Sequence, residues 1–340
     1  MTSASFRTIG DLSQLLATRS QNVMLKERLY RLTNELSTGQ VSDLSRHLGR
    51  DTSRLAELDR SLSLSGAHRR SALSAGGMLA TMQQALDGLQ DLQSDLANQT
   101  SGIPLGGTTA DVANAGTAAR DGFSRIVQVL NTSYGGTTLF AGIATDGRAV
   151  AASETMLAAL QAAASGVTDA AGLQAAVDAW FDTPGGGFEV AGYVGDSGPG
   201  RITRPIDAGE SVAIEARADD PAFRDVMKAV ALVALAADPT LGLDLSARKD
   251  AMGAASQRLY STPSGILAIQ SALGLAENRV EDAVVRHGGR AVTLGILRNE
   301  MVGADPYETA SQLQEVETLL QTHYTVTARL SNLSLAKYLR

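Results

Sequence analysis

The 340-residue chain contains no cysteine. This absence excludes disulfide bonds, thiolate catalysis and cysteine-ligated zinc. Aromatic residues make up only 4% of the chain although hydrophobic residues make up 44%, so the apolar content is mostly Ala, Leu and Val. Such a composition favours helices that pack along narrow seams over a thick globular core.

The chain also lacks an excess of positive charge. Its net charge is -7 at pH 7, so no global basic field indicates nucleic-acid binding. Basic residues cluster at Arg46–Arg54 and His68–Arg70, but they alternate with apolar and acidic residues, and we interpret them as solvated or subunit-contact helix faces. No apolar run reaches the length of about 18 residues that a membrane helix needs. The N-terminus has no apolar stretch typical of a cleaved secretory signal.

The N-terminal segment carries a heptad pattern of leucines. Leu25, Leu29, Leu32 and Leu36 are spaced by 4, 3 and 4 residues, which places them on one seam of a helix. Gly39 falls at the next seam position, and a new leucine register follows. We therefore expect one helix to end near Gly39 and Ser42 or Asp43 to cap the next one.

The C-terminal third repeats this theme. Apolar residues keep 3,4 spacing from Ile266 to His287 and resume at Leu294. A further helix is expected to start at "DPYE", where Asp305 caps and Pro306 takes the first helical position. Its apolar positions are Leu313, Val316, Leu320, Leu330, Leu333 and Leu339.

The middle of the chain has a different composition. Residues 183–218 are rich in Gly and Pro, and the runs "GFEVAGYV", "RITRPI" and "SVAIEAR" predict short strands separated by turns. An Ala-rich helix is expected near Ala152–Phe181, and another one from Asp220-Pro221, including a buried stretch at Val226–Ala237.

These patterns predict a mainly α fold: a long antiparallel helical bundle or coiled coil of the N- and C-terminal segments, with a small central β-rich domain. We expect a terminal helical domain (1–44 and 302–340), a long-helix domain (45–145 and 225–301) and a small outer domain (146–224). Several leucines of the terminal helices have no local partner, which argues for assembly with other subunits.

The stretch "GDSGPG" raises the possibility of a nucleophilic Ser197, because serine proteases carry a similar hexapeptide. A serine nucleophile needs a base within hydrogen-bond reach and a third group that orients the base. The four histidines lie on predicted long helices, away from the glycine-rich segment, and Asp, Ser, Gly and Pro are common turn formers. We expect Ser197 to lie in an exposed turn between strands. His287 is interpreted as a packing residue, and we expect no metal site and, without a phosphate-loop motif, no cofactor.

Four stretches carry a resemblance to the flagellin superfamily, most closely to its hook–filament junction branch, the hook-associated protein 3 group. The stretches follow in chain order and span nearly the whole sequence: "RLTNELSTG" (Arg31–Gly39), "LNTSYGGTTLFAGIATDGRA" (Leu130–Ala149), "YVGDSGPGRITRPIDAGESVAIEARADDPAF" (Tyr193–Phe223) and Asp305–Arg340, which ends in "SLAKYLR".

The resemblance implies a structural protein of the bacterial flagellum with no enzymatic activity. It implies export through the flagellar type III channel without a cleaved signal peptide, and an extracellular location. It also implies a ring of copies of this chain between hook-associated protein 1 and flagellin, and an export chaperone on the C-terminal helix. The terminal helices would polymerise by coiled-coil packing, and the expected assembly residues are Leu25, Leu29, Leu32, Leu36, Leu313, Val316, Leu320, Leu330, Leu333 and Leu339.

One segment departs from the family pattern. Members usually carry Ser-Asp-Asp-Pro shortly after Ser-Thr-Gly, whereas this chain has "QVSDLSRHLGRD" and keeps only Ser42-Asp43. The loop contacts of that region therefore do not carry over. Two alternatives stay open at this point: a flagellin that builds the filament itself, and a serine hydrolase that uses Ser197.

Overall fold

The computed structural model describes the backbone of residues 5–338 and the side chains of residue 13 and residues 16–329. The fold is mainly α with a small β-containing part, as the sequence predicts, and its strands form two small antiparallel hairpins. Two compact units form: one contains residues 1–65 and 289–340, and the other contains residues 66–288.

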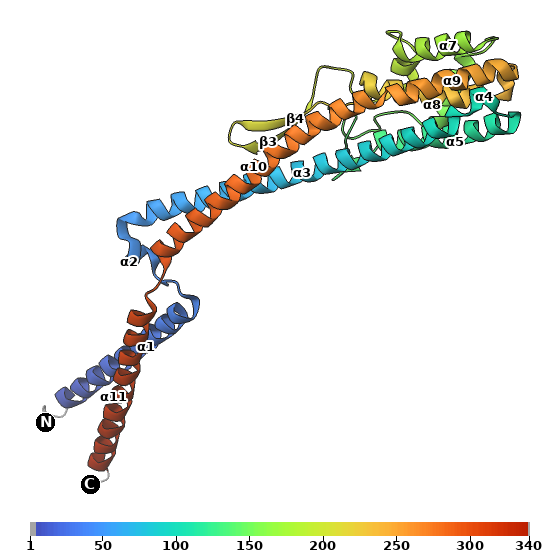
Figure 1. The fold of residues 1–340 in the computed structure, drawn as a ribbon. Helices are drawn as coiled ribbons and strands as arrows, with labels where there is room; N and C mark the ends of the chain where they lie inside the picture. The colour runs from blue at the N-terminus through green and yellow to red at the C-terminus, as the bar shows by residue number, and fades with distance from the viewer. Residues whose placement is uncertain (1–4, 339–340) are drawn as a thin grey trace. The chain divides into compact units, whose positions relative to one another are not determined.

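Helices dominate both units (Figure 1). Their bounds are α1 Ser5–Thr38, α2 Leu44–Leu48, α3 Thr52–Ser101, α4 Ile103–Gly106, α5 Thr109–Leu130, α6 Ser153–Ala163, α7 Ala170–Asp182, α8 Pro221–Ala236, α9 Leu245–Ser261, α10 Pro263–Val302 and α11 Pro306–Tyr338. The strands are β1 Ser133–Tyr134, β2 Thr137–Thr138, β3 Ile202–Asp207 and β4 Glu210–Ile214.

In the terminal unit, α1 and α11 pack against each other. The predicted break at Gly39 is confirmed: α1 ends at Thr38, and Gly39 adopts φ 67°, a left-handed conformation that favours glycine. Asp43 caps α2 by accepting a hydrogen bond from the backbone N–H of Arg46 at 3.0 Å. The backbone N–H of Val41 donates to the carbonyl of Val302 at 2.9 Å, so the segment before α2 runs beside the end of α10.

The predicted start of α11 is also confirmed. The carboxylate of Asp305 accepts hydrogen bonds from the N–H groups of Tyr307 and Glu308 at 2.8 and 3.2 Å, and Pro306 is the first helical residue. Helix α10 begins at Pro263, directly after α9. The Thr262 hydroxyl donates to the carbonyl of Arg258, so Thr262 belongs to the end of α9.

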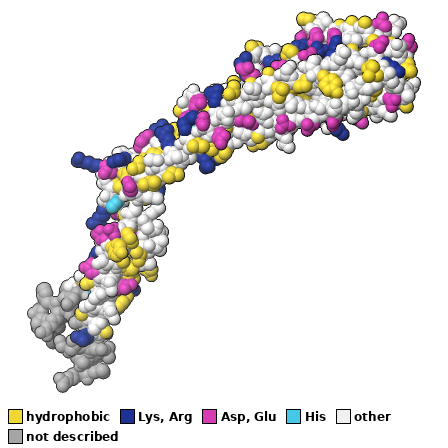
Figure 2. All heavy atoms as spheres, in the orientation of Figure 1, with side chains coloured by type: hydrophobic (Ala, Val, Ile, Leu, Met, Phe, Trp, Pro, Cys, Tyr) yellow, Lys and Arg dark blue, Asp and Glu magenta, His cyan; other side chains and the backbone are white. Residues whose placement is uncertain are grey.

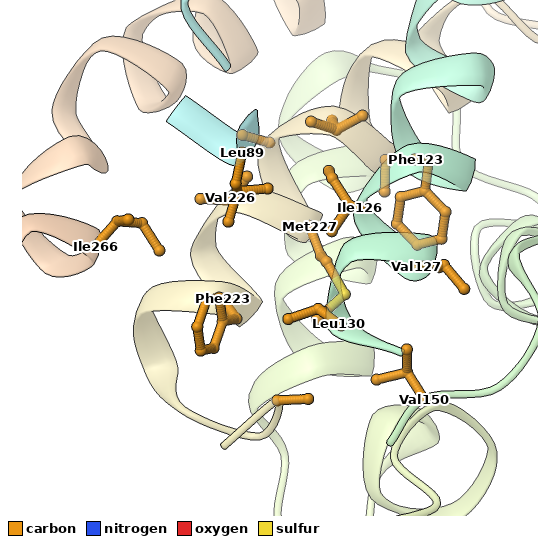
Figure 3. Packing of buried hydrophobic residues seen from close by; sticks show 14 of the residues in the cluster. Leu89, Phe123, Ile126, Val127, Leu130, Val150, Phe223, Val226, Met227 and Ile266 are labelled. Atoms are coloured by element: carbon orange, nitrogen blue, oxygen red, sulfur yellow. The ribbon is translucent and has the colours of Figure 1, made fainter. Parts of the chain in front are cut away.

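In the central unit, α3 and α10 run antiparallel. The Gln83 side chain donates to the carbonyl of Gln270 at 2.9 Å, and Gly76 lies beside Val280. Further along α3, the buried Gln93 side chain donates to the carbonyl of Leu259 in α9 at 2.7 Å. A large apolar core lies between α3, α5, α8 and α9. Figure 3 shows Ile126 and Leu130 of α5 close to Met227 of α8. The predicted buried stretch Val226–Ala237 is confirmed, because every residue in it is buried.

Two sequence expectations in the middle of the chain are wrong. The Ala-rich segment forms two helices, α6 and α7, because Gly166 turns the chain at φ 81° and Asp169 caps α7. The run "GFEVAGYV" forms a π-helical turn at Phe188–Gly192 instead of a strand. The aromatic rings explain this turn: Phe188 and Tyr193 stack on the same side, whereas an odd separation along a strand would place them on opposite faces.

The other two predicted strands are confirmed as an antiparallel hairpin. β3 pairs with β4 in the register Ile202↔Ile214 to Pro205↔Ser211. The hairpin lies on the long helices. The Ser71 hydroxyl of α3 donates to the carbonyl of Pro205 at 2.6 Å, and Arg279 of α10 donates to the carbonyl of Ser211 at 3.2 Å.

Candidate assembly interface

Ser197 lies in an exposed loop between the π-helical turn and β3, so it does not connect two strands. Its hydroxyl makes no hydrogen bond within the part of the chain that the structure describes. The loop is nevertheless fixed: the N–H of Asp196 donates to the carbonyl of Ala141 at 2.9 Å, and Arg217 donates to the carbonyl of Gly198. Nearby, burial raises the pKa of Tyr193 to about 12. The hexapeptide therefore works as a structural loop without the partners that a nucleophile needs.

The histidines correct one expectation. His287 of α10 contacts the glycine-rich segment after all, because the β3–β4 hairpin folds back onto the long helices. The buried His287 ring places Nε2 at 3.0 Å from the carbonyl of Ile206 and 3.6 Å from the Asp207 carboxylate, and it stacks on His68 at 5.4 Å. The hydrogen bond from the Ala208 N–H lowers the pKa of the Asp207 carboxyl, and the electrostatic effect of His287 lowers it to a smaller extent. His287 thus packs as expected, and the described residues contain no cluster of side chains suited to a metal ion.

The α1–α11 pair brings most of the predicted assembly residues together. Leu32, Val316 and Leu320 are buried, and Leu25, Leu29 and Leu313 pack against them partly buried. This cluster holds α1 and α11 together, because burying one apolar side chain contributes roughly 1.5–3 kcal/mol to stability. The part of the seam that the structure describes is therefore buried between two helices of the same chain.

The remaining predicted residues behave differently. Leu36 is 40% exposed and does not join the cluster. The side chains of Leu330 and Leu333, and Leu339 as a whole, lie outside the described residues.

The sequence identifies Leu16 as a leucine outside the paired seam, but the second apolar stripe on α1 to which it belongs was missed. Leu16, Val23 and Tyr30 recur every seven residues and are 58%, 49% and 74% exposed. Seven residues are close to two helical turns, so the three side chains share one face. That face is roughly opposite the Leu25–Leu29–Leu32 seam, because its members are offset by half a turn from it. The strict heptad spacing was the available signal.

Helix α11 also exposes apolar side chains outside the seam, namely Leu319 at 43% and Val326 at 49%. Figure 2 shows hydrophobic side chains gathered on the described part of this region. Exposed apolar side chains on both helices of a pair with so small a core are typical of a surface that a partner covers. These faces are the candidate functional site. Among the described residues, none of the helices is long and apolar enough to cross a membrane.

Comparison with known proteins agrees with this geometry. Residues 263–339, which cover all of α10 and α11, match the family model of the bacterial flagellin C-terminal helical region. The fold is similar to the solved structure of a provisionally named flagellar hook-associated protein from Vibrio parahaemolyticus, with 14% identity and a TM-score of 0.50. That match covers 74% of this chain and 99% of the other. No curated protein matches the sequence.

The fold is built of long helices, and its paired terminal helices α1 and α11 expose apolar faces. The C-terminal region is thus similar to that of flagellins, and the fold is similar to that of the hook-associated protein, which agrees with the resemblance that the sequence indicates.

Proposed function

We propose that this protein is the junction subunit that joins the flagellar hook to the flagellin filament. The observation that carries the proposal is the α1–α11 pair, which buries a small seam and leaves the Leu16–Val23–Tyr30 stripe exposed. A subunit built this way is incomplete alone, because its terminal helices present apolar surface that only further subunits can bury.

In this proposal the terminal domain (1–44 and 302–340) is the polymerising part, the long-helix domain (45–145 and 225–301) lies further out, and residues 146–224 form the outermost domain. Copies of the chain form a ring that contacts hook-associated protein 1 on one side and flagellin on the other. An export chaperone binds the C-terminal helix before the chain leaves through the type III channel. These roles rest on the resemblance of the four sequence stretches to the junction branch.

The test is deletion of residues 305–340 in the organism. The proposal predicts that hooks remain, that filaments are lost and that unassembled flagellin is released into the medium. Antibody labelling of intact flagella should give a thin band at the hook–filament boundary. The variant Ser197→Ala is the matched control, and we expect it to behave as wild type. A truncated strain that swims normally contradicts the proposal.

One observation favours a second candidate function, a filament subunit: the matched family model is that of flagellin itself. The same labelling experiment separates the two. Label along the whole filament, together with long filaments from the purified protein, supports a flagellin. A band confined to the boundary supports the junction subunit.

A further inference from the structure

The β3–β4 hairpin of the central unit leaves backbone groups of β4 pointing outward. Pro205 of β3 lies opposite Ser211 of β4 and has no N–H group, so the two residues cannot exchange a pair of main-chain hydrogen bonds. The bulge between Pro205 and Asp207 sets the ladder in this register. Hydrogen-bonded and non-hydrogen-bonded positions alternate along an antiparallel ladder. The N–H and C=O groups of Ser211 and of Ala213, two residues further on, therefore point away from β3.

Two contacts of the hairpin agree with this alternation. The outward carbonyl of Pro205 accepts a hydrogen bond from the Ser71 hydroxyl of α3, and the outward carbonyl of Ser211 accepts one from Arg279 of α10. Ala213 is exposed, and within the part of the chain that the structure describes its backbone forms no hydrogen bond outside the hairpin. One N–H and one C=O group are therefore open to pairing on the outer edge of β4.

This edge faces a groove along α10. β4 lies beside α10 (Figure 1), and the groove between β4, the start of α8 and α10 has a volume of about 790 Å³. Ile269 and Leu273 of α10 give the groove apolar surface, and Ala268 and Ala272 keep it open because their side chains are short. The groove therefore offers apolar contact to an extended segment, and β4 offers main-chain groups with which that segment can pair.

The two outer edges of the hairpin differ in their protection against a further strand. Proline and bulges are common means of blocking an edge strand. β3 carries both, at Pro205 and directly after it. β4 carries neither between Ser211 and Ile214, and its edge opens onto the groove. An open edge beside apolar surface is the arrangement that binds an extended peptide by adding it to the sheet as another strand.

The charges around the groove select the kind of segment. Three carboxylates line it, against the single guanidinium of Arg279: those of Glu215, Asp220 and Asp225. Glu215 and Asp225 already pair with neighbouring basic residues, whereas Asp220 caps α8 and forms no ion pair with a described residue. A basic side chain in the bound segment would complement Asp220, and an acidic one would be repelled.

We propose that the groove between β4 and α10 docks an extended segment of a partner protein. The segment pairs with Ala213 through its main chain, rests apolar side chains on α10 and directs a lysine or arginine at Asp220. Main-chain hydrogen bonds give such a contact its affinity, and the side-chain contacts give it specificity. The site belongs to the central unit, whereas the proposed function rests on the terminal helices, so the failure of one leaves the other standing.

Binding of synthetic peptides to the full chain tests the site. The probe is a fluorescently labelled peptide, Arg-Val-Ala-Val-Ala-Arg, with an arginine at each end so that either strand direction brings one of them to Asp220. In one matched peptide glutamate replaces both arginines, and in another proline replaces both alanines. Fluorescence anisotropy should show that the probe binds and that each matched peptide binds at least about tenfold more weakly, because charge complementarity or main-chain pairing is lost.

Ala213→Pro in the protein removes the outward N–H group and leaves the ladder with β3, which does not use that group. It should weaken binding of the probe by about tenfold. Ala272→Leu, at an exposed position of α10, should weaken binding by filling the groove. Thr203→Pro, at the residue opposite Ala213 in β3, is the matched control and should leave binding unchanged. Circular dichroism verifies that all three variants keep the fold.

Hydrogen exchange locates the bound peptide. The amide of Ala213 should exchange more slowly with the probe present, and the amide of Thr203 should not change. A wild-type chain that does not bind the probe overturns the proposal, as does equal affinity of the wild type, Ala213→Pro and Ala272→Leu. Self-association of the chain that Ala213→Pro abolishes would assign the groove to a second copy, and this result also overturns the assignment to a partner protein.

Discussion

The two units bury apolar surface in contrasting ways. The central unit encloses a large continuous core in which Phe123, Phe223 and the whole of α8 from Val226 onward are buried. The described core of the terminal unit's α1–α11 pair consists of Leu32, Val316 and Leu320, with three partly buried neighbours. The difference suggests that the central unit is stable through its own packing, whereas the terminal helices gain part of their stability from other subunits.

The largest expected effect comes from breaking the central core. Phe223 is fully buried and its ring meets Phe140 edge-on at 5.5 Å. Phe223→Ala should lower the free energy of unfolding by roughly 3–5 kcal/mol, because it removes apolar contacts and leaves a cavity. Chemical denaturation measures this change. Leu105→Ala, at a residue that is 94% exposed, is the control and should change little. Equal effects of both substitutions would contradict a self-sufficient central core.

A smaller change in the free energy of unfolding is expected from substitutions that test how closely the central helices approach. A Cβ atom at Gly116 of α5 would lie 2.1 Å from the Cβ atom of Ala237, whereas one at Gly88 of α3 would meet nothing within 4 Å. Gly116→Ala should therefore destabilise the protein by roughly 1–3 kcal/mol through overpacking. Gly88→Ala should stabilise it by about 0.5–1 kcal/mol, because alanine loses less backbone entropy in a helix. Melting temperatures that shift in the same direction would show that the close approach is not as described.

The third prediction concerns the exposed stripe of the terminal unit. Val23→Ser with Tyr30→Ser should weaken assembly by about tenfold, equivalent to about 1.4 kcal/mol, while the unfolding transition of the monomer stays the same. Sedimentation velocity and thermal melting measure the two properties separately. Leu64→Ser with Leu73→Ser, at exposed leucines of α3, controls for a general loss of surface hydrophobicity. A double variant that assembles normally would remove the stripe from the interface.

The smallest expected effect comes from removing the ion pair between Asp178 and Arg258 in the central unit. The hydrogen bonds from Arg258, at 2.5 and 2.8 Å, lower the pKa of the Asp178 carboxyl. A lowered carboxyl pKa contributes stability above the unfolded value of about 3.9, and this contribution is lost as pH falls through the folded pKa. Both side chains are partly exposed, so we expect only about 0.5 kcal/mol.

Melting curves of wild type and Asp178→Asn test this pair. The wild type should be the more stable one at pH 6, and the difference should shrink as the pH is lowered from about 5 to 3. Asp250→Asn, at an exposed aspartate of α9, should show no such pH dependence. A difference that grows on acidification would contradict the sign of the Asp178 pKa shift.

The sequence predicts the helical part of the fold well because its signals are local. Heptad leucines, the glycine stop at Gly39 and the caps at Asp43, Asp220 and Asp305 depend on neighbours within a few residues, and all appear where expected. The strand prediction for "GFEVAGYV" is wrong because aromatic packing with Trp180 and Phe181, which lie outside the run, decides its conformation.

The candidate site could be predicted only in part. The seam leucines follow from their own spacing, but whether a leucine is covered depends on the partner helix, so the exposed Leu36 could not be distinguished from the buried Leu32. The contact of His287 with Ile206 likewise depends on where the hairpin folds back. Likewise, Arg31 of α1 and Arg46 of α2 line one hollow of the terminal unit, although the sequence places them on different helices.

Hydrogen exchange on the free and the assembled protein tests the contrast between the two units most directly. We predict that the amides of α1 from Leu16 to Thr38 and of α11 from Tyr307 to Arg329 become much more protected on assembly, while those of α5 and α8 keep the protection that they have in the monomer. Terminal helices that are already as protected in the monomer as in the assembly would contradict the claim that they are completed by neighbouring subunits.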